Sequence, residues 1–150
     1  MPCSPLFLYS FLITFVDIKQ LIMKVEISNG ELLDKLSILE LKQTNISDKK
    51  KLSNVKIEFE ELNPLALKIF KDNPSFISEL YLKLSQINAK LWKIEDDIRQ
   101  CERDKSFDSK FVQLARDVYF TNDIRSELKK EINILTKSGL IEEKSYEDYS

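Results

Sequence analysis

A chain of 150 residues with only two glycines and four prolines has too few turn residues for a sheet protein, which needs frequent turns. The formal net charge of -2 argues against general nucleic-acid binding, because domains that bind nucleic acid usually carry a strongly basic face. The absence of histidine excludes Ser-His-Asp and Cys-His catalysis and histidine-ligated zinc. Any metal site would have oxygen ligands only, and we predict neither a metal site nor a cofactor.

Residues 1–22 contain an apolar run, Leu6 to Val16, that is too short to span a bilayer. A secretory signal would have a basic residue before this run and small residues at a cleavage site after it, and the sequence has neither. We predict that these residues are an extension upstream of a true start at Met23. A weak membrane anchor or signal, or an extra helix of the domain, are the alternatives. Residues 23–150 are expected to form a single helical domain without a stable membrane span.

The expected domain begins with a short segment, Lys24 to Ser28, in which apolar and polar residues alternate. An isolated strand is unstable, so this segment is expected to be an extended arm. Ser28 and Glu31 form a Ser-x-x-Glu capping box, which predicts that a first helix covers residues 29–44.

A second helix is expected after a polar break at residues 45–48, because apolar residues then recur at alternating spacings of three and four. Pro64 interrupts this pattern. The residue before a proline resists the helical conformation, so Asn63 is expected to cap a separate short helix that starts at Pro64.

The third helix is the clearest element, since no glycine or proline occurs between Ser75 and Ser106. Its apolar stripe keeps the three-four spacing throughout: Ile77, Leu80, Leu84, Ile87, Leu91, Ile94, Ile98 and Cys101. A turn over residues 104–106 is expected to lead into a fourth helix that carries Phe107. Gly139 lies where a C-terminal helix cap belongs.

These elements predict an all-α fold, an antiparallel helical bundle built on a long hairpin of the third and fourth helices, with the extended N-terminal arm. A long coiled-coil dimer with the same apolar stripes is the alternative, and a homodimer of two packed hairpins stays open. Short loops favour the hairpin. Cys3 and Cys101 have no metal-ligand spacing and indicate no disulfide framework, so a cytoplasmic location is expected.

Arginine is rare and confined to one segment of this chain. The sequence has nineteen lysines but four arginines, all between Arg99 and Arg125. Arginine differs from lysine by its planar fork, which suits carboxylate and phosphate groups. If the predicted hairpin turns near Lys105, residues whose numbers sum to about 211 face each other, which brings Glu95 near Arg116 and Trp92 near Tyr119.

This geometry predicts a polar cluster between the third and fourth helices. Its members are Glu95, Asp96, Arg99, Arg116, Tyr119, Asn122, Asp123 and Arg125. Arg125 occupies a seam position, where a buried guanidinium needs a carboxylate or a ligand, unless the stripe rotates and the side chain reaches solvent. The cluster is either an anion pocket for phosphate or carboxylate, or a salt-bridge network that locks the hairpin.

Four segments together resemble an uncharacterised family of short bacterial proteins, a domain of unknown function. They are MKVEISNGELLDKLSILELK at residues 23–42, LWKIEDDIRQCE at 91–102, FVQLARDVYFTNDIRSELKKEIN at 111–133 and IEEKSY at 141–146. The resemblance omits the first 22 residues, and it implies that the IEDDIR, LARDVY and NDIR segments, which contain the polar cluster, are typical of the family. It also implies genes that often lie beside those for glycosyltransferases of surface-polysaccharide synthesis.

Two functions follow from these observations. The first is a non-catalytic helical accessory protein that binds a protein partner in cell-surface polysaccharide synthesis, as the resemblance implies. The second is a small enzyme or sensor that uses the polar cluster on a small anionic metabolite, phosphorylated or carboxylated. The lack of histidine favours the first, and the confinement of arginine favours the second.

Overall fold

The computed structural model describes residues 24–73, 75–145 and 147, which form four α-helices and no strand. The helices are α1 (Asn29–Asn45), α2 (Lys49–Asp72), α3 (Phe76–Asp104) and α4 (Ser109–Leu135). The predicted all-α hairpin bundle is therefore confirmed, and residues 24–28 precede it without helix or strand. The predictions for residues 1–22 lie outside the described residues.

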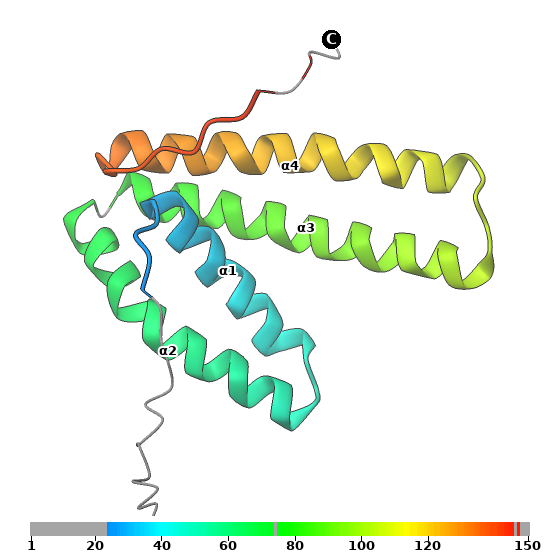
Figure 1. The fold of residues 1–150 in the computed structure, drawn as a ribbon, viewed down its shortest axis with the longest axis horizontal. Coiled ribbons are helices and arrows are strands. Elements are labelled where there is room, and N and C mark those ends of the chain that lie inside the picture. The colour runs from blue at the N-terminus through cyan, green and yellow to red at the C-terminus, as the bar shows by residue number, and fades with distance from the viewer. Residues whose placement is uncertain (1–23, 74, 146, 148–150) are drawn as a thin grey trace, which may run out of the picture.

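Helix α1 lies at the centre of the arrangement, because it contacts each of the other three helices, whereas α2 packs mainly against α1. Helices α3 and α4 run antiparallel along each other as the longest contact of the fold, and their connecting loop lies well away from α1 and α2 (Figure 1). The chain is thus a long hairpin that carries a shorter hairpin against one part of its length.

The hydrophobic core lies where all four helices meet, near the start of α3 and the end of α4. Its buried members share apolar side chains and come from every helix: Leu32, Leu33, Leu36, Ala66, Ile69, Ile77, Leu80, Leu84 and Ile132. Each fully buried leucine or isoleucine contributes roughly 1.5–3 kcal/mol of transfer free energy. This packing fixes the angle at which α1 crosses α3 and α4.

Side chains at and just beyond the end of α4 complete the N-terminus of α1 together with Ser28. The first amide groups of a helix have no partner within the helix. Here the backbone N–H of Asn29 donates to Ser138 Oγ at 3.1 Å, and that of Gly30 donates to Asn133 Oδ1 at 2.6 Å. The Glu31 N–H donates to the predicted cap, Ser28 Oγ, at 3.1 Å. The start of α1 is therefore bonded to the end of α4.

Three predicted helix boundaries are wrong. Helix α2 continues through Pro64 to Asp72, so Asn63 does not cap a new helix. The proline ring is exposed, but a proline inside a helix costs about 3 kcal/mol, because it removes one internal hydrogen bond and crowds the carbonyl of the preceding turn. The burial of Ala66 and Ile69 beyond it stabilises the continuous helix against this cost.

The cap predicted at Gly139 is also absent, because Lys137 rather than a glycine takes the left-handed conformation after α4, with φ 50°. The Ser138 N–H then donates to Asn133 O at 2.8 Å and closes the helix two residues before the predicted position. Helix α4 likewise begins at Ser109 rather than at Phe107, since Asp108 caps it by accepting from the Lys110 and Phe111 amides.

We expect Lys105→Gly to raise the free energy of unfolding by about 0.5–1 kcal/mol. Lys105 ends α3 with φ 53°, a conformation that costs any residue with a Cβ atom but not glycine. Urea denaturation measures the gain. The exposed Lys90 in the middle of α3 is the control, since Lys90→Gly should lower stability by a similar amount. A loss of stability in Lys105→Gly would contradict the expected strain.

Within the described ranges, no helix combines the length and the apolar character that crossing a bilayer would require.

Candidate functional site

A cleft of about 370 Å³ lies between α1, α3 and α4. Its lining residues are Ile38, Leu41, Asn88, Leu91, Trp92, Glu95, Asp96, Arg99, Asn122 and Arg125. Five of the eight residues of the predicted cluster therefore line one cleft. Its volume lies within the range of small-molecule pockets, which is roughly 300–1,000 Å³.

The other three predicted residues, Arg116, Tyr119 and Asp123, do not line this cleft. The Arg116 guanidinium lies over the Phe120 ring, 5.8 Å from its centre, and is exposed. The Tyr119 ring contacts the same phenylalanine at a centroid distance of 4.6 Å. Arg116 and Tyr119 thus both contact Phe120 and form a separate cluster on α4, outside the cleft.

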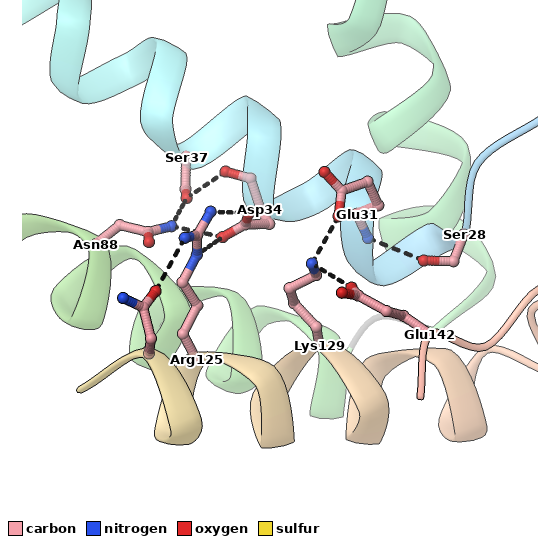
Figure 2. Close-up of polar contacts among 9 residues, drawn as sticks. Ser28, Glu31, Asp34, Ser37, Asn88, Arg125, Lys129 and Glu142 are labelled. Atoms are coloured by element: carbon pink, nitrogen blue, oxygen red, sulfur yellow. Dashed lines mark hydrogen bonds and ion pairs between the residues drawn. The ribbon is translucent and has the colours of Figure 1, made fainter. Parts of the chain in front are cut away.

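The Arg125 side chain on the wall of the cleft pairs with a buried carboxylate of α1. The Arg125 Nε donates to Asp34 Oδ1 at 2.8 Å, and Nη2 donates to Asp34 Oδ2 at 2.5 Å (Figure 2). The Asp34 residue is 1% exposed, while the Arg125 side chain is 27% exposed. The carboxylate is therefore enclosed, and the guanidinium reaches from it toward the open cleft.

Two further polar side chains hold Asp34 in place. The Asn88 Nδ2 donates to Asp34 Oδ1 at 2.8 Å and to Ser37 Oγ at 2.7 Å. The Ser37 hydroxyl donates in turn to the Asp34 backbone carbonyl at 2.8 Å. Asn88 and Ser37 are both buried, so α1, α3 and α4 are joined by one polar network inside an otherwise apolar interface.

The hydrogen bonds to Asp34 raise the pKa of Arg125 above its ordinary value, even though burial acts in the opposite direction. The Arg125 guanidinium therefore stays charged across the physiological pH range. Replacing a buried ion pair by apolar side chains is often neutral or stabilising, so such a pair is weak evidence for stability alone. Arg125 lies at the wall of the cleft, where a bound ligand would contact it.

The outer part of the cleft carries a second, exposed arginine. Arg99 Nη1 donates to the Glu95 carboxylate at 2.6 Å and to the Glu95 backbone carbonyl at 2.8 Å. Both side chains are more than 40% exposed, so this pair contributes little to stability. Trp92, the single tryptophan of the chain, is half-buried and lies one turn before Glu95 on α3.

One turn beyond Arg125, Lys129 bridges two carboxylates from different parts of the chain. Its Nζ lies 2.6 Å from Glu31 Oε2 on α1 and 2.7 Å from Glu142 Oε2 in the segment after α4 (Figure 2). Burial lowers the pKa of Lys129, but the bonds to Glu142 and Glu31 raise it by more, so the net shift is upward. The hydrogen bond between Glu142 and Lys129 also lowers the pKa of Glu142.

The sequence interpretation missed the partners of the predicted residues: Ser37 and Asp34 on α1, Asn88 on α3, and the Lys129 bridge. One signal was present, because Asp34 follows two leucines inside the apolar face of the first helix. The stripe assigned to α3 used Ile87, but the structure buries Asn88 and leaves Ile87 half-buried. The stripe is therefore wrong by one residue at this position, although Leu84 and Leu91 on either side are buried as predicted.

Comparison with known proteins supplies a family but no activity. No curated protein and no solved structure matches this chain. The model of one family, described as a family of unknown function (DUF6165), matches residues 23–149. The match includes the buried ion pair, every lining residue of the cleft and the Lys129 bridge. The chain accordingly belongs to the DUF6165 family, whose function is unknown.

Proposed function

We propose that this protein binds a small metabolite carrying a phosphate or carboxylate group in the cleft between α1, α3 and α4. The observation that carries the proposal is the Arg125 guanidinium, which Asp34 holds in a fixed orientation at the cleft wall. A preorganised arginine loses less side-chain entropy when it binds an anion than a mobile surface arginine does.

The guanidinium retains donors for a ligand after its bonds to Asp34 are made. Nε and Nη2 bond the carboxylate, whereas Nη1 makes only a long contact of 3.3 Å to Asn122 Oδ1. An arginine fork carries five N–H groups, so an incoming anion can bind to its remaining edge.

The rest of the cleft suits an organic group attached to that anion. Ile38, Leu41, Leu91 and Trp92 give it apolar surface, while Asn88 and Asn122 add amide groups. Ligand sites typically combine mostly apolar walls with a few well-placed polar groups. A nucleotide sugar or a small dicarboxylate has both kinds of surface.

We expect Arg125→Lys to abolish ligand binding while it keeps the positive charge, because lysine lacks the planar fork. Nucleotide sugars and small dicarboxylates are titrated while the fluorescence of Trp92 is recorded well below the unfolding temperature. A compound present at a hundred times its dissociation constant also stabilises the parent protein by about 2.7 kcal/mol in thermal unfolding. The variant should lose both responses.

Arg116→Lys is the matched control, since Arg116 is exposed over Phe120 and does not line the cleft. It should bind each compound as the parent protein does. Equal loss in both variants would mean that binding does not depend on the arginine of the cleft in particular, and a parent protein that responds to none of these compounds would overturn the proposal.

A second candidate is the accessory role in surface-polysaccharide synthesis that the family resemblance implies. The supporting observation is the free-standing end of the α3–α4 hairpin, which lies beyond α1 and α2 (Figure 1). Phe107 and Val112 near its loop are 53% and 54% exposed. Apolar side chains on an uncovered projection suit contact with a protein partner.

A deletion strain that is complemented with the parent gene or with a variant gene distinguishes the two candidate functions. Surface polysaccharide is measured after restoring the parent gene, Arg125→Lys, or Phe107→Ser together with Val112→Ser. Loss with the hairpin variant alone favours the partner role, and loss with Arg125→Lys alone favours the ligand role. Unchanged polysaccharide in the deletion strain contradicts the link to this pathway.

A further inference from the structure

The segment that follows α4 turns back and lies along that helix (Figure 1). Two ion pairs attach it, since Lys129 Nζ contacts Glu142 at 2.7 Å and Lys130 Nζ contacts Glu143 at 2.8 Å. The apolar residues of this segment, Leu140 and Ile141, remain exposed. Beyond Ser138, which accepts a hydrogen bond from the Asn29 amide, the segment is therefore attached mainly by charge, with little apolar burial to stabilise it.

A second pocket, of about 160 Å³, lies between this segment and α4. Its lining residues are all polar or charged: Asn122, Arg125, Ser126, Lys129, Glu142 and Lys144. Asn122 and Arg125 line this pocket and the Trp92 cleft alike, so the two cavities meet at these side chains. The two cavities therefore lie next to each other.

Glu142 is one of the carboxylates that neutralise the cations around this pocket. Arg125, Lys129 and Lys144 bring three positive charges. Asp34 and Glu31, which pair with Arg125 and Lys129 from α1, bring two negative charges. Glu142 supplies the third. The Lys129 side chain is 12% exposed, and a cation enclosed to this degree requires nearby anions.

Of the two carboxylates on Lys129, only Glu142 is held by a weakly attached segment. Glu31 belongs to α1, whose first turn is bonded to α4. The Glu142 side chain is 48% exposed, and the residues around it are exposed as well. Moving Glu142 out of the pocket would therefore disturb little else in the fold.

We infer that the pocket of Asn122, Arg125, Ser126, Lys129 and Lys144 is an anion subsite, which Glu142 occupies until a phosphate or carboxylate replaces it. The inference rests on the proposed function, because it places the anionic end of the ligand next to the cleft that takes the organic part. Guanidinium, ammonium, hydroxyl and amide donors together match the several oxygens of such a group. An incoming anion restores the charge balance that Glu142 provides.

The test compares anion binding by the full-length parent protein with that of Glu142→Gln, which keeps the size of the side chain but removes its charge. Pyrophosphate and succinate are titrated separately by calorimetry, so that phosphate and carboxylate ligands are distinguished. An exposed ion pair contributes enough to change affinity by about three- to fivefold. Glu142→Gln should therefore bind at least one of the two anions more tightly than the parent by that factor.

Glu143→Gln is the matched control, since Glu143 pairs with Lys130, which does not line the pocket. It should bind as the parent does. A second measurement uses limited trypsin digestion of the parent, in which the bound anion should accelerate cleavage after Lys137 as Glu142 leaves Lys129. Circular dichroism verifies that each variant is folded.

The outcomes separate the inference from the proposed function. If the parent binds an anion and Glu142→Gln binds it no more tightly, Glu142 is a structural attachment and the inference fails, while the proposed function stands. If neither protein binds pyrophosphate or succinate, the inferred anion subsite is wrong. Ligand titrations followed by Trp92 fluorescence then test binding in the cleft separately.

Discussion

Asp34→Asn is expected to lower the free energy of unfolding by about 2–4 kcal/mol, because it removes the charge that neutralises Arg125. Asp34 accepts three hydrogen bonds, two from Arg125 and one from Asn88. An amide at this position turns one acceptor oxygen into a donor, which would face another donor. Partial exposure of Arg125 keeps the expected cost below that of a fully enclosed pair.

Urea denaturation of the parent and the variant measures this change. The control is Asp97→Asn, which makes the same chemical replacement at an ion pair between neighbouring turns of α3. That pair with Lys93 is solvent-exposed, so the change should be within about 0.5 kcal/mol. A loss of less than 1 kcal/mol in Asp34→Asn would mean that solvent stabilises the Arg125 guanidinium without its carboxylate.

A double variant distinguishes a structural role from a binding role at the same pair. Asp34→Leu combined with Arg125→Met removes both charges and keeps the volume, so it should be more stable than Asp34→Asn. The Trp92 fluorescence of this double variant should not change when any anion is added. Stability recovered without binding would indicate that the pair is maintained for the ligand rather than for the fold.

The helices were predictable because their signals are local. The capping box at Ser28 fixed the start of the first helix, and the absence of glycine and proline fixed the extent of the third. The predicted helix break at Pro64 was wrong for the opposite reason, because it depends on contacts that are not local. Tertiary packing of Ala66 and Ile69 outweighs a local helix-breaking signal, and this packing depends on helices that lie far away in the sequence.

The candidate site was only partly predictable, because its central pair joins residues that are 91 positions apart. Periodicity placed Arg125 on the inner face of α4 but contained no information on which helix would supply its carboxylate. The predicted facing register grouped five residues that share the cleft but wrongly added three others. Trp92 shares it with Asn122, whereas Tyr119 does not line it, because the loop extends to Asp108.

Gly30→Ala is expected to lower the free energy of unfolding by about 2–4 kcal/mol, although the same change inside an exposed helix usually stabilises it. A Cβ atom built at Gly30 would lie only 2.4 Å from the backbone oxygen of Lys129. Backbone cannot rotate away as a side chain can, so α1 and α4 would have to separate. Their separation would stretch the bond from the Gly30 amide to Asn133 Oδ1, both of which are buried.

Thermal unfolding should show this as a fall in Tm of roughly 10 °C for a domain of this size. Gly139→Ala provides the control, since a Cβ atom there meets nothing within 4 Å and the backbone has no positive φ. Its stability should stay within about 0.5 kcal/mol of the parent. If Gly30→Ala is as stable as this control, then α1 does not approach α4 closely enough to hold Asp34 against Arg125, and the fixed guanidinium on which the binding proposal depends would be lost with it.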